Sequence, residues 1–222
     1  MGATEIIKDL GFWTPYLAVG LLWNIVISLV AMVLGSGVGG VLALLRASTG
    51  KARAKTGSAV TELMRNVPTF VFQFYLVFML PGSLAIPFTD AHLPIPAWLK
   101  ASLALALAVA GFVSDNLRQA LRAPLEHRGR DLLLFVLNWS NYFVIIVMAS
   151  STASVIGVSE LVSRCNTVIN VMGKTDMMVW VYLYAMAWFF LFSFLATKLI
   201  RGISHFVDHR RSRANTKPAT SV

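Results

Sequence analysis

Five apolar stretches separated by short polar segments run along the chain. They cover about residues 16–45, 66–80, 97–117, 131–149 and 177–200. A helix of about 20 apolar residues crosses the ~30 Å hydrocarbon core of a bilayer, and a longer one crosses it with a tilt. The pattern therefore predicts an all-α integral membrane protein with five transmembrane helices.

The polar segments between these stretches predict the connections. Residues 46–55 combine basic side chains with Gly, Ser and Ala, which is typical of a cytoplasmic loop. Residues 81–96 carry four prolines and almost no charge, which indicates an external loop. Residues 160–176 are polar and are also expected to be external, whereas the chain beyond residue 200 is basic and then rich in Ser, Thr, Ala and Pro.

The distribution of Lys and Arg predicts the orientation. With five spans and the N-terminus outside, 15 of the 19 Lys and Arg residues lie on the inner side. Cytoplasmic loops carry such an excess of basic residues, and an even number of spans would place one basic cluster on the wrong side. We expect an N-out, C-in topology with an external segment (1–15), a transmembrane domain (16–200) and a basic cytoplasmic tail (201–222).

The composition agrees with a membrane protein. Of the 222 residues, 57% are hydrophobic and only 13% are charged, and the mean hydropathy is +0.70. The net charge of +9 does not indicate nucleic-acid binding, because the basic residues form short clusters between apolar runs. The N-terminus lacks a small-residue cleavage site, so we expect no cleaved signal peptide.

The sequence carries no pattern that indicates an enzyme, a cofactor or a metal site. Gly173, Lys174 and Thr175 resemble the end of a phosphate loop, but Val168 stands where that pattern needs glycine. His205 and His209 have helical spacing without a third ligand. The lone Cys165 has neither a disulfide partner nor a second cysteine at ligand spacing, so we assign it no chemistry.

Small residues in the first and third stretches predict close helix packing. Gly35 and Gly39, and likewise Ser36 and Gly40, have the small-xxx-small spacing that lets a second helix backbone approach. The alanine-rich residues 101–112 also indicate helix contacts more than lipid exposure.

Ionisable residues near the membrane boundary form two pairs with a spacing of three. Glu62 and Arg65 share one helix face, as do Asp115 and Arg118. Each pair has two interpretations: a boundary ion pair, or groups that face protein or a water-filled path.

Further polar residues lie in and after the fourth stretch. Asn138 and Asn141 would be unsatisfied against lipid, so they face either other helices or a pathway. The hydroxyl-rich residues 150–158 are interpreted as a kink or as a short helix that lines a cavity.

Four separated stretches together resemble one family of membrane proteins. They are GLLWNIVISLVAMVLGSGVGGVLALLRAS (20–48), E-L-x-R-x-x-P-x-x-V-x-x-F (62–74), GFVSDNLRQAL (111–121) and NYFVIIVMASSTASVIGVSEL (141–161). Their order and content are similar to those of polar amino-acid ABC transporter permeases, the inner-membrane components of binding-protein-dependent transport for His, Glu, Gln, Arg or opines.

The resemblance implies a fold, partners and site residues. It implies an ABC importer permease core in the bacterial inner membrane, which forms a homo- or heterodimer with a second permease and works with cytoplasmic ATP-binding subunits and an external solute-binding protein. We expect Asn141, Ser151, Thr152 and Ser154 to face the substrate pathway. Glu62, Arg65, Asp115 and Arg118 are expected to form a polar cluster on the cytoplasmic side that orders a gate.

The sequence departs from the family between the third and fourth spans. The family docks its ATPase through a cytoplasmic coupling helix there, but this connector is about twenty residues shorter, and Glu126, His127, Arg128 and Gly129 are what remains of it. Met148 and Ala149 also stand where the family has Lys and Asp. A second hypothesis is therefore a non-transporting scaffold or accessory subunit derived from such a permease.

Overall fold

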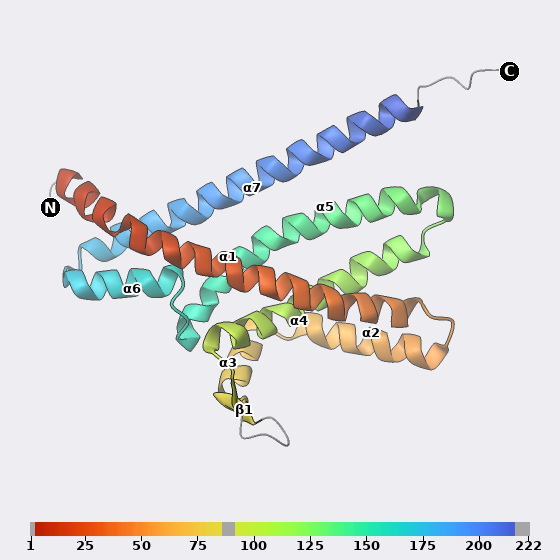
Figure 1. Ribbon diagram of the computed structural model, residues 1–222, viewed down its shortest axis with the longest axis horizontal. Coiled ribbons are helices and arrows are strands. Elements are labelled where there is room, and N and C mark those ends of the chain that lie inside the picture. The colour runs from red at the N-terminus through yellow and green to blue at the C-terminus, as the bar shows by residue number, and fades with distance from the viewer. Residues whose placement is uncertain (1–2, 86–91, 216–222) are drawn as a thin grey trace.

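The computed structural model describes residues 3–85 and 92–215, and these residues are almost entirely helical (Figure 1). One short antiparallel hairpin pairs Ser83 with Pro94 and Ala85 with His92. The elements in order are α1 (Ala3–Ala47), α2 (Lys51–Asn66), α3 (Thr69–Met79), β1 (Ser83–Ala85), β2 (His92–Pro94), α4 (Ala97–Arg122), α5 (Leu125–Ala149), the 3₁₀ helix η1 (Ser150–Ile156), α6 (Leu161–Met172) and α7 (Met177–Asn215).

Four helical segments in the described residues are long and apolar enough to cross a membrane. They are Thr4–Ala47, Ala97–Arg122, Leu125–Ile156 and Met177–Ser204. They contain the first, third, fourth and fifth apolar stretches, so these four stretches form helices that are candidate membrane spans, as expected.

The second stretch does not form the expected single helix over residues 66–80. α3 has only 11 residues and is about 17 Å long, which is too short to cross the hydrocarbon core by itself. Pro68 explains the break, since proline disfavours the helical conformation in the preceding residue, and Val67 is extended. Residues 51–55, which we expected to lie in a cytoplasmic loop, instead form the first turns of α2.

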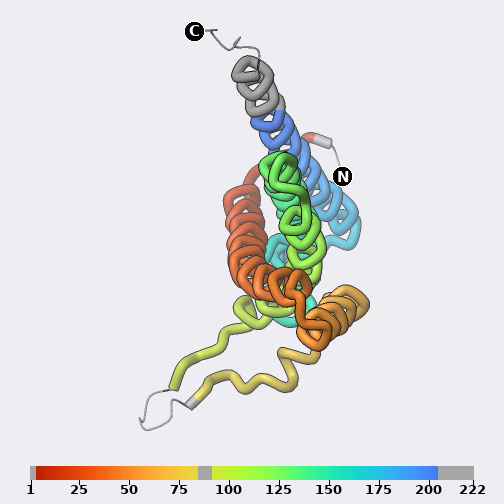
Figure 2. Tube along the Cα trace, turned by 90° about the vertical axis from the view of Figure 1, so that its right-hand side faces the viewer, coloured from red at the N-terminus to blue at the C-terminus, as the bar shows by residue number. Residues whose placement is uncertain are grey.

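The other connections are also more regular than the sequence indicated. The external loop expected at 81–96 contains the β1–β2 hairpin, and Figure 2 shows the chain on either side of residues 86–91 extending away from the helices. The external segment expected at 160–176 contains α6. No break separates residues 3–15 from the rest of α1 or residue 201 from the rest of α7, so the proposed segment boundaries fall inside helices.

The main core lies between α1 and α4, which run side by side in the same direction. Gly35 and Gly39 make this contact possible, because a Cβ atom at either position would lie about 2.5–2.6 Å from a carbonyl oxygen of α4. The predicted packing role is confirmed for these two glycines. Gly40 faces open space, and Ser36 instead accepts a hydrogen bond from the indole nitrogen of Trp139 on α5 at 2.8 Å.

A second core joins the N-terminal half of α1 to α6 and α7. Its fully buried residues include Leu17, Leu161, Cys165 and Val181. Gly20 allows the close approach, since a Cβ atom there would lie 2.7 Å from the Cα of Leu161. α6 is thereby fixed across the end of the bundle.

The basic clusters of the sequence come together at one end of the molecule. The α1–α2 turn, the α4–α5 turn and the C-terminal part of α7 all lie at the right-hand end in Figure 1, opposite the N-terminus and α6. This is the arrangement that the predicted topology requires, and the side of the membrane that this end faces stays a prediction.

Candidate functional site

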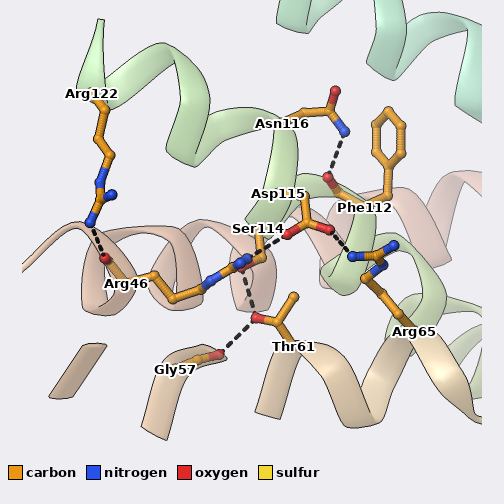
Figure 3. Close-up of polar contacts among 9 residues, drawn as sticks. All are labelled: Arg46, Gly57, Thr61, Arg65, Phe112, Ser114, Asp115, Asn116 and Arg122. Carbon is orange, nitrogen blue, oxygen red and sulfur yellow. Dashed lines mark hydrogen bonds and ion pairs between the residues drawn. The ribbon is translucent and has the colours of Figure 1, made fainter. Parts of the chain in front are cut away.

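Asp115 of α4 joins three helices through two ion pairs. Its Oδ1 lies 2.6 Å from Nη1 of Arg46 on α1, and its Oδ2 lies 2.8 Å from Nη1 of Arg65 on α2 (Figure 3). The Arg46 side chain is only 10% exposed, so little water reaches it, and the Asp115 carboxylate compensates its positive charge.

Hydroxyl groups extend the network beneath the ion pairs. Arg46 donates to Oγ of Ser114 at 2.9 Å, and Ser114 shares a 2.9 Å hydrogen bond with Thr61 of α2. Thr61 in turn donates to the carbonyl oxygen of Gly57 (Figure 3). Gly57 lacks the Cβ that would come within 2.8 Å of the Arg46 side chain, so α2 lies close to α1 at this point.

The structure brings together part of the predicted polar cluster. Arg65 and Asp115 form an ion pair with each other, not with the residues three positions away in their own helices. Arg118 lies one helical turn after Asp115 but makes no ion pair among the described residues. Glu62 is exposed and likewise has no ion-pair partner there.

Arg46 lies at the centre of this network. The sequence predicted only that it is one of the basic residues on the inner side of the membrane. It lies seven residues after Gly39, which places the two on the same helix face. Because Gly39 contacts α4, this spacing was a signal that Arg46 also faces α4.

A cavity of about 660 Å³ adjoins the ion pairs at the α4–α5 turn. A smaller cavity of about 410 Å³ lies at the α2–α3 break, and Arg65 and Asp115 line both. The smaller cavity also contacts Tyr142, whose ring stacks on Phe112 with centroids 3.9 Å apart.

The predicted coupling residues occupy the first turns of α5. Ala123 and Pro124 alone connect α4 to α5, so no separate helix lies between them. Glu126, His127 and Gly129 are exposed, whereas Arg128 donates to the carbonyl oxygen of Leu121 at 3.3 Å. These four positions therefore form the start of a long helix, and three of them are exposed.

The predicted pathway residues make mostly local hydrogen bonds. Asn141 is exposed on α5, and its amide donates to the carbonyl of Leu137. Ser151 and Ser154 donate to carbonyls three residues earlier in the chain. Thr152 also donates to Oε1 of the buried Gln73 at 2.8 Å and thereby connects η1 to α3.

A second buried polar cluster at the opposite end was not predicted. The Asn24 amide donates to Ser150 at 2.9 Å and to Glu160 at 3.0 Å, and its oxygen accepts from the backbone N–H of Leu161. Glu160 is fully buried and caps α6 by accepting from the backbone of Val162 and Ser163.

Burial raises the pKa of Glu160 above its ordinary value, although hydrogen bonds from Val162, Ser163 and Asn24 act in the opposite direction. Burial, with a smaller contribution from the charge of Glu160, raises the pKa of Cys165 to about 12. A thiol with such a pKa is protonated at neutral pH and unreactive, which agrees with assigning it no chemistry.

Comparisons with known proteins identify the fold. No protein-family model and no curated protein matches the sequence. Among solved structures, the chain is similar to one described as "Crystal structure of an amino acid ABC transporter with histidines". The TM-score is 0.74 at 19% sequence identity, over 92% of this chain and 98% of the other. The chain therefore has the fold of that transporter chain along nearly its whole length.

Proposed function

We propose that this chain is a permease subunit of an ABC importer for polar amino acids. The observation that carries the proposal is the shared fold over nearly the full length of both chains. The four motif stretches support it independently, because they occur in the family's order along the sequence. In this proposal, the chain spans the bacterial inner membrane with its N-terminus outside and forms the translocation pathway with a second permease. Separate ATP-binding subunits drive transport, and an external solute-binding protein delivers the substrate.

The ion network is the proposed gate element. The Arg46–Asp115–Arg65 contacts join α1, α2 and α4, so a shift of α2 would break one ion pair while the other remains. The proposed cluster includes Arg118 and Glu62 at its margin. Asn141, Ser151, Thr152 and Ser154 are the proposed pathway groups on α5 and η1.

A second candidate function is a non-transporting scaffold or accessory subunit. The two-residue connection between α4 and α5 favours it, because a coupling helix of several turns, at about 1.5 Å per residue, has no place there. If the chain does couple to an ATPase, the exposed start of α5 at Glu126, His127 and Gly129 is the surface that the connection leaves for it.

Purification of the tagged chain from its native membrane tests both candidates. The importer proposal expects an ATP-binding subunit and a second permease to co-purify, with ATP hydrolysis in lipid nanodiscs stimulated by the solute-binding protein. Replacing residues 126–130 with Gly and Ser should abolish that stimulation. Failure of an ATP-binding subunit to co-purify, or hydrolysis that is the same without this chain, would support the scaffold.

A further inference from the structure

The 660 Å³ cavity lies where α1, α2, α4 and α5 meet at the α4–α5 turn. Its size falls within the ~300–1,000 Å³ range typical of small-molecule sites. The residues that line it are Arg46, Arg65, Asp115, Arg118, Gln119, Arg122, Ala123, Pro124, His127, Arg130 and Asp131.

The lining carries an excess of positive charge. Five arginines and two aspartates contribute a net charge of +3 when His127 is neutral. Both carboxylate oxygens of Asp115 are already in ion pairs, and Asp131 lies 3.8 Å from Arg130. Arg118 and Arg122 have no carboxylate partner within the part of the chain that the structure describes. Arg122 donates one hydrogen bond to the carbonyl oxygen of Arg46 at 3.2 Å (Figure 3), so the positive charges of both arginines remain uncompensated and available to a ligand.

Two guanidinium groups in this wall also have unused donors. Arg46 is buried, and its Nε has no hydrogen-bond partner among the described residues. The same holds for Nε of Arg118. Buried donors are nearly always satisfied in proteins, and guanidinium groups match the geometry of phosphate oxygens. An anion in the cavity would supply the missing acceptors.

The position of the cavity fits the same ligand. The candidate span of α4 ends at Arg122 and that of α5 begins at Leu125, so the cavity lies where spanning helices meet the membrane surface. Basic pockets between such helices bind anionic head groups. We propose that this cavity binds a phosphate-type anion, either the head-group phosphate of an anionic lipid or free phosphate. This inference goes beyond the proposed function and does not depend on it.

Binding can be measured on the full chain in nanodiscs without other subunits. Discs of phosphatidylcholine alone are compared with discs that also contain phosphatidylglycerol, by melting temperature and by lipid retained in native mass spectrometry. A separate arm adds inorganic phosphate to phosphatidylcholine discs, with chloride at equal ionic strength as reference. Stabilisation by phosphatidylglycerol alone identifies a lipid as the source, and equal stabilisation by phosphate identifies a soluble anion.

Two double variants separate the cavity from general surface charge. Arg118→Gln with Arg122→Gln should weaken anion binding about tenfold or more, because two charge-assisted contacts are lost. Lys51→Gln with Arg53→Gln removes the same charge from exposed positions of α2 outside the cavity and should change binding less than about twofold. Gln119→Glu adds a negative charge at an exposed position in the lining, so it should weaken anion binding without removing an arginine contact. This variant replaces the arginine double variant in the test if that variant does not fold.

The proposal is overturned if neither phosphatidylglycerol nor phosphate stabilises the chain. It is also overturned if the two double variants weaken binding equally, since diffuse surface charge then accounts for it. Because no ATP-binding subunit or solute-binding protein is present, a negative result here leaves the proposed transport function standing, and a failed ATPase assay leaves this site standing.

Discussion

Single residues decide the stability of the polar end of the bundle, and Asp115 connects most of them. Asp115→Asn removes the charge that compensates the buried Arg46. Losing one partner of a buried ion pair costs about 3–5 kcal/mol, and we expect about 2–3 kcal/mol here because the Asp115 side chain is 28% exposed. Thermal unfolding of the purified chain checks this.

Glu62→Gln is the matched control and should change the stability by less than about 0.5 kcal/mol, because Glu62 is exposed. Equal effects of the two variants would contradict the assigned network.

Gly39 and Gly40 allow a test of the α1–α4 contact at adjacent positions. Gly39→Ala places a methyl group about 2.6 Å from the carbonyl oxygen of Ala110, so we expect a loss of about 1–3 kcal/mol. Gly40→Ala meets nothing within 4 Å and should be neutral or slightly stabilising, by up to about 1 kcal/mol, because alanine favours the helix. Melting temperatures of the two variants measure the difference, and the reverse order would exclude this packing.

Thr152 and Ser151 allow a test of the contact between η1 and α3. The Thr152 hydroxyl reaches another helix, whereas the Ser151 hydroxyl bonds only to the carbonyl three residues earlier. Thr152→Val leaves Oε1 of the buried Gln73 without its donor and should destabilise the chain by about 1–2 kcal/mol. Ser151→Ala removes a bond only to the carbonyl of Met148 and should have little effect on unfolding. If both variants unfold like the wild type, the contact between η1 and α3 contributes no stability.

At the scale of elements, α6 depends on its buried cap. Because burial raises the pKa of Glu160, the folded chain holds the proton more tightly than the unfolded chain does. The contribution of Glu160 to the free energy of unfolding is therefore largest below the ordinary pKa of a glutamate, and it is lost as the pH rises through the raised pKa of the folded state. Glu160→Gln stays uncharged, so the melting temperature of the wild type relative to this variant should fall as the pH rises from about 4 to 8. A relative melting temperature that rises with pH would show that the capping hydrogen bonds outweigh burial.

The α2–α3 break shows why one element was predicted wrongly. Residues 66–80 are apolar enough to resemble a span, but Pro68 restricts Val67 and separates two helices. α2 includes residues 51–55, which were predicted as part of a loop because they are basic. It is held in place as a helix by Thr61 and Gly57 against α1 and α4, contacts that no local pattern contains.

At the scale of the whole molecule, the orientation can be tested directly. Cys165 is fully buried and its pKa is raised to about 12, so it should not react with a maleimide, and single cysteines can be added to the natural chain. The test uses Lys174→Cys and Lys51→Cys, both at exposed positions. Lys51 begins α2 and Lys174 lies between α6 and α7, and the α1–α2 turn and α6 are at opposite ends of the bundle (Figure 1). In intact spheroplasts, a membrane-impermeant maleimide should label position 174 at once and position 51 only after permeabilisation. The opposite result would reverse the topology.

The local sequence determined the features that depend on composition and spacing. Four apolar runs of sufficient length produced the four candidate spans, and Gly35 and Gly39 marked the face of α1 that packs on α4. The shortness of the connector before residue 131 also followed from the sequence, because residue count alone limits what can lie between two helices. The candidate spans and the packing role of the two glycines are confirmed, because each depends on residues within one helix. That the connector is a shortened coupling region stays a prediction.

Only the tertiary structure decided which polar groups meet. The sequence left open whether Asp115 and Glu62 pair with the arginines three residues away or face other parts of the protein, and the structure pairs Asp115 with Arg46 and Arg65 from two other helices. Likewise, Asn24 reaches Glu160 across 136 positions. A buried charge or amide takes the partner that the packing of helices brings within hydrogen-bond distance, and that packing depends on side-chain shape along the whole interface. Spacing along the chain therefore identified the polar residues, and the fold chose their partners.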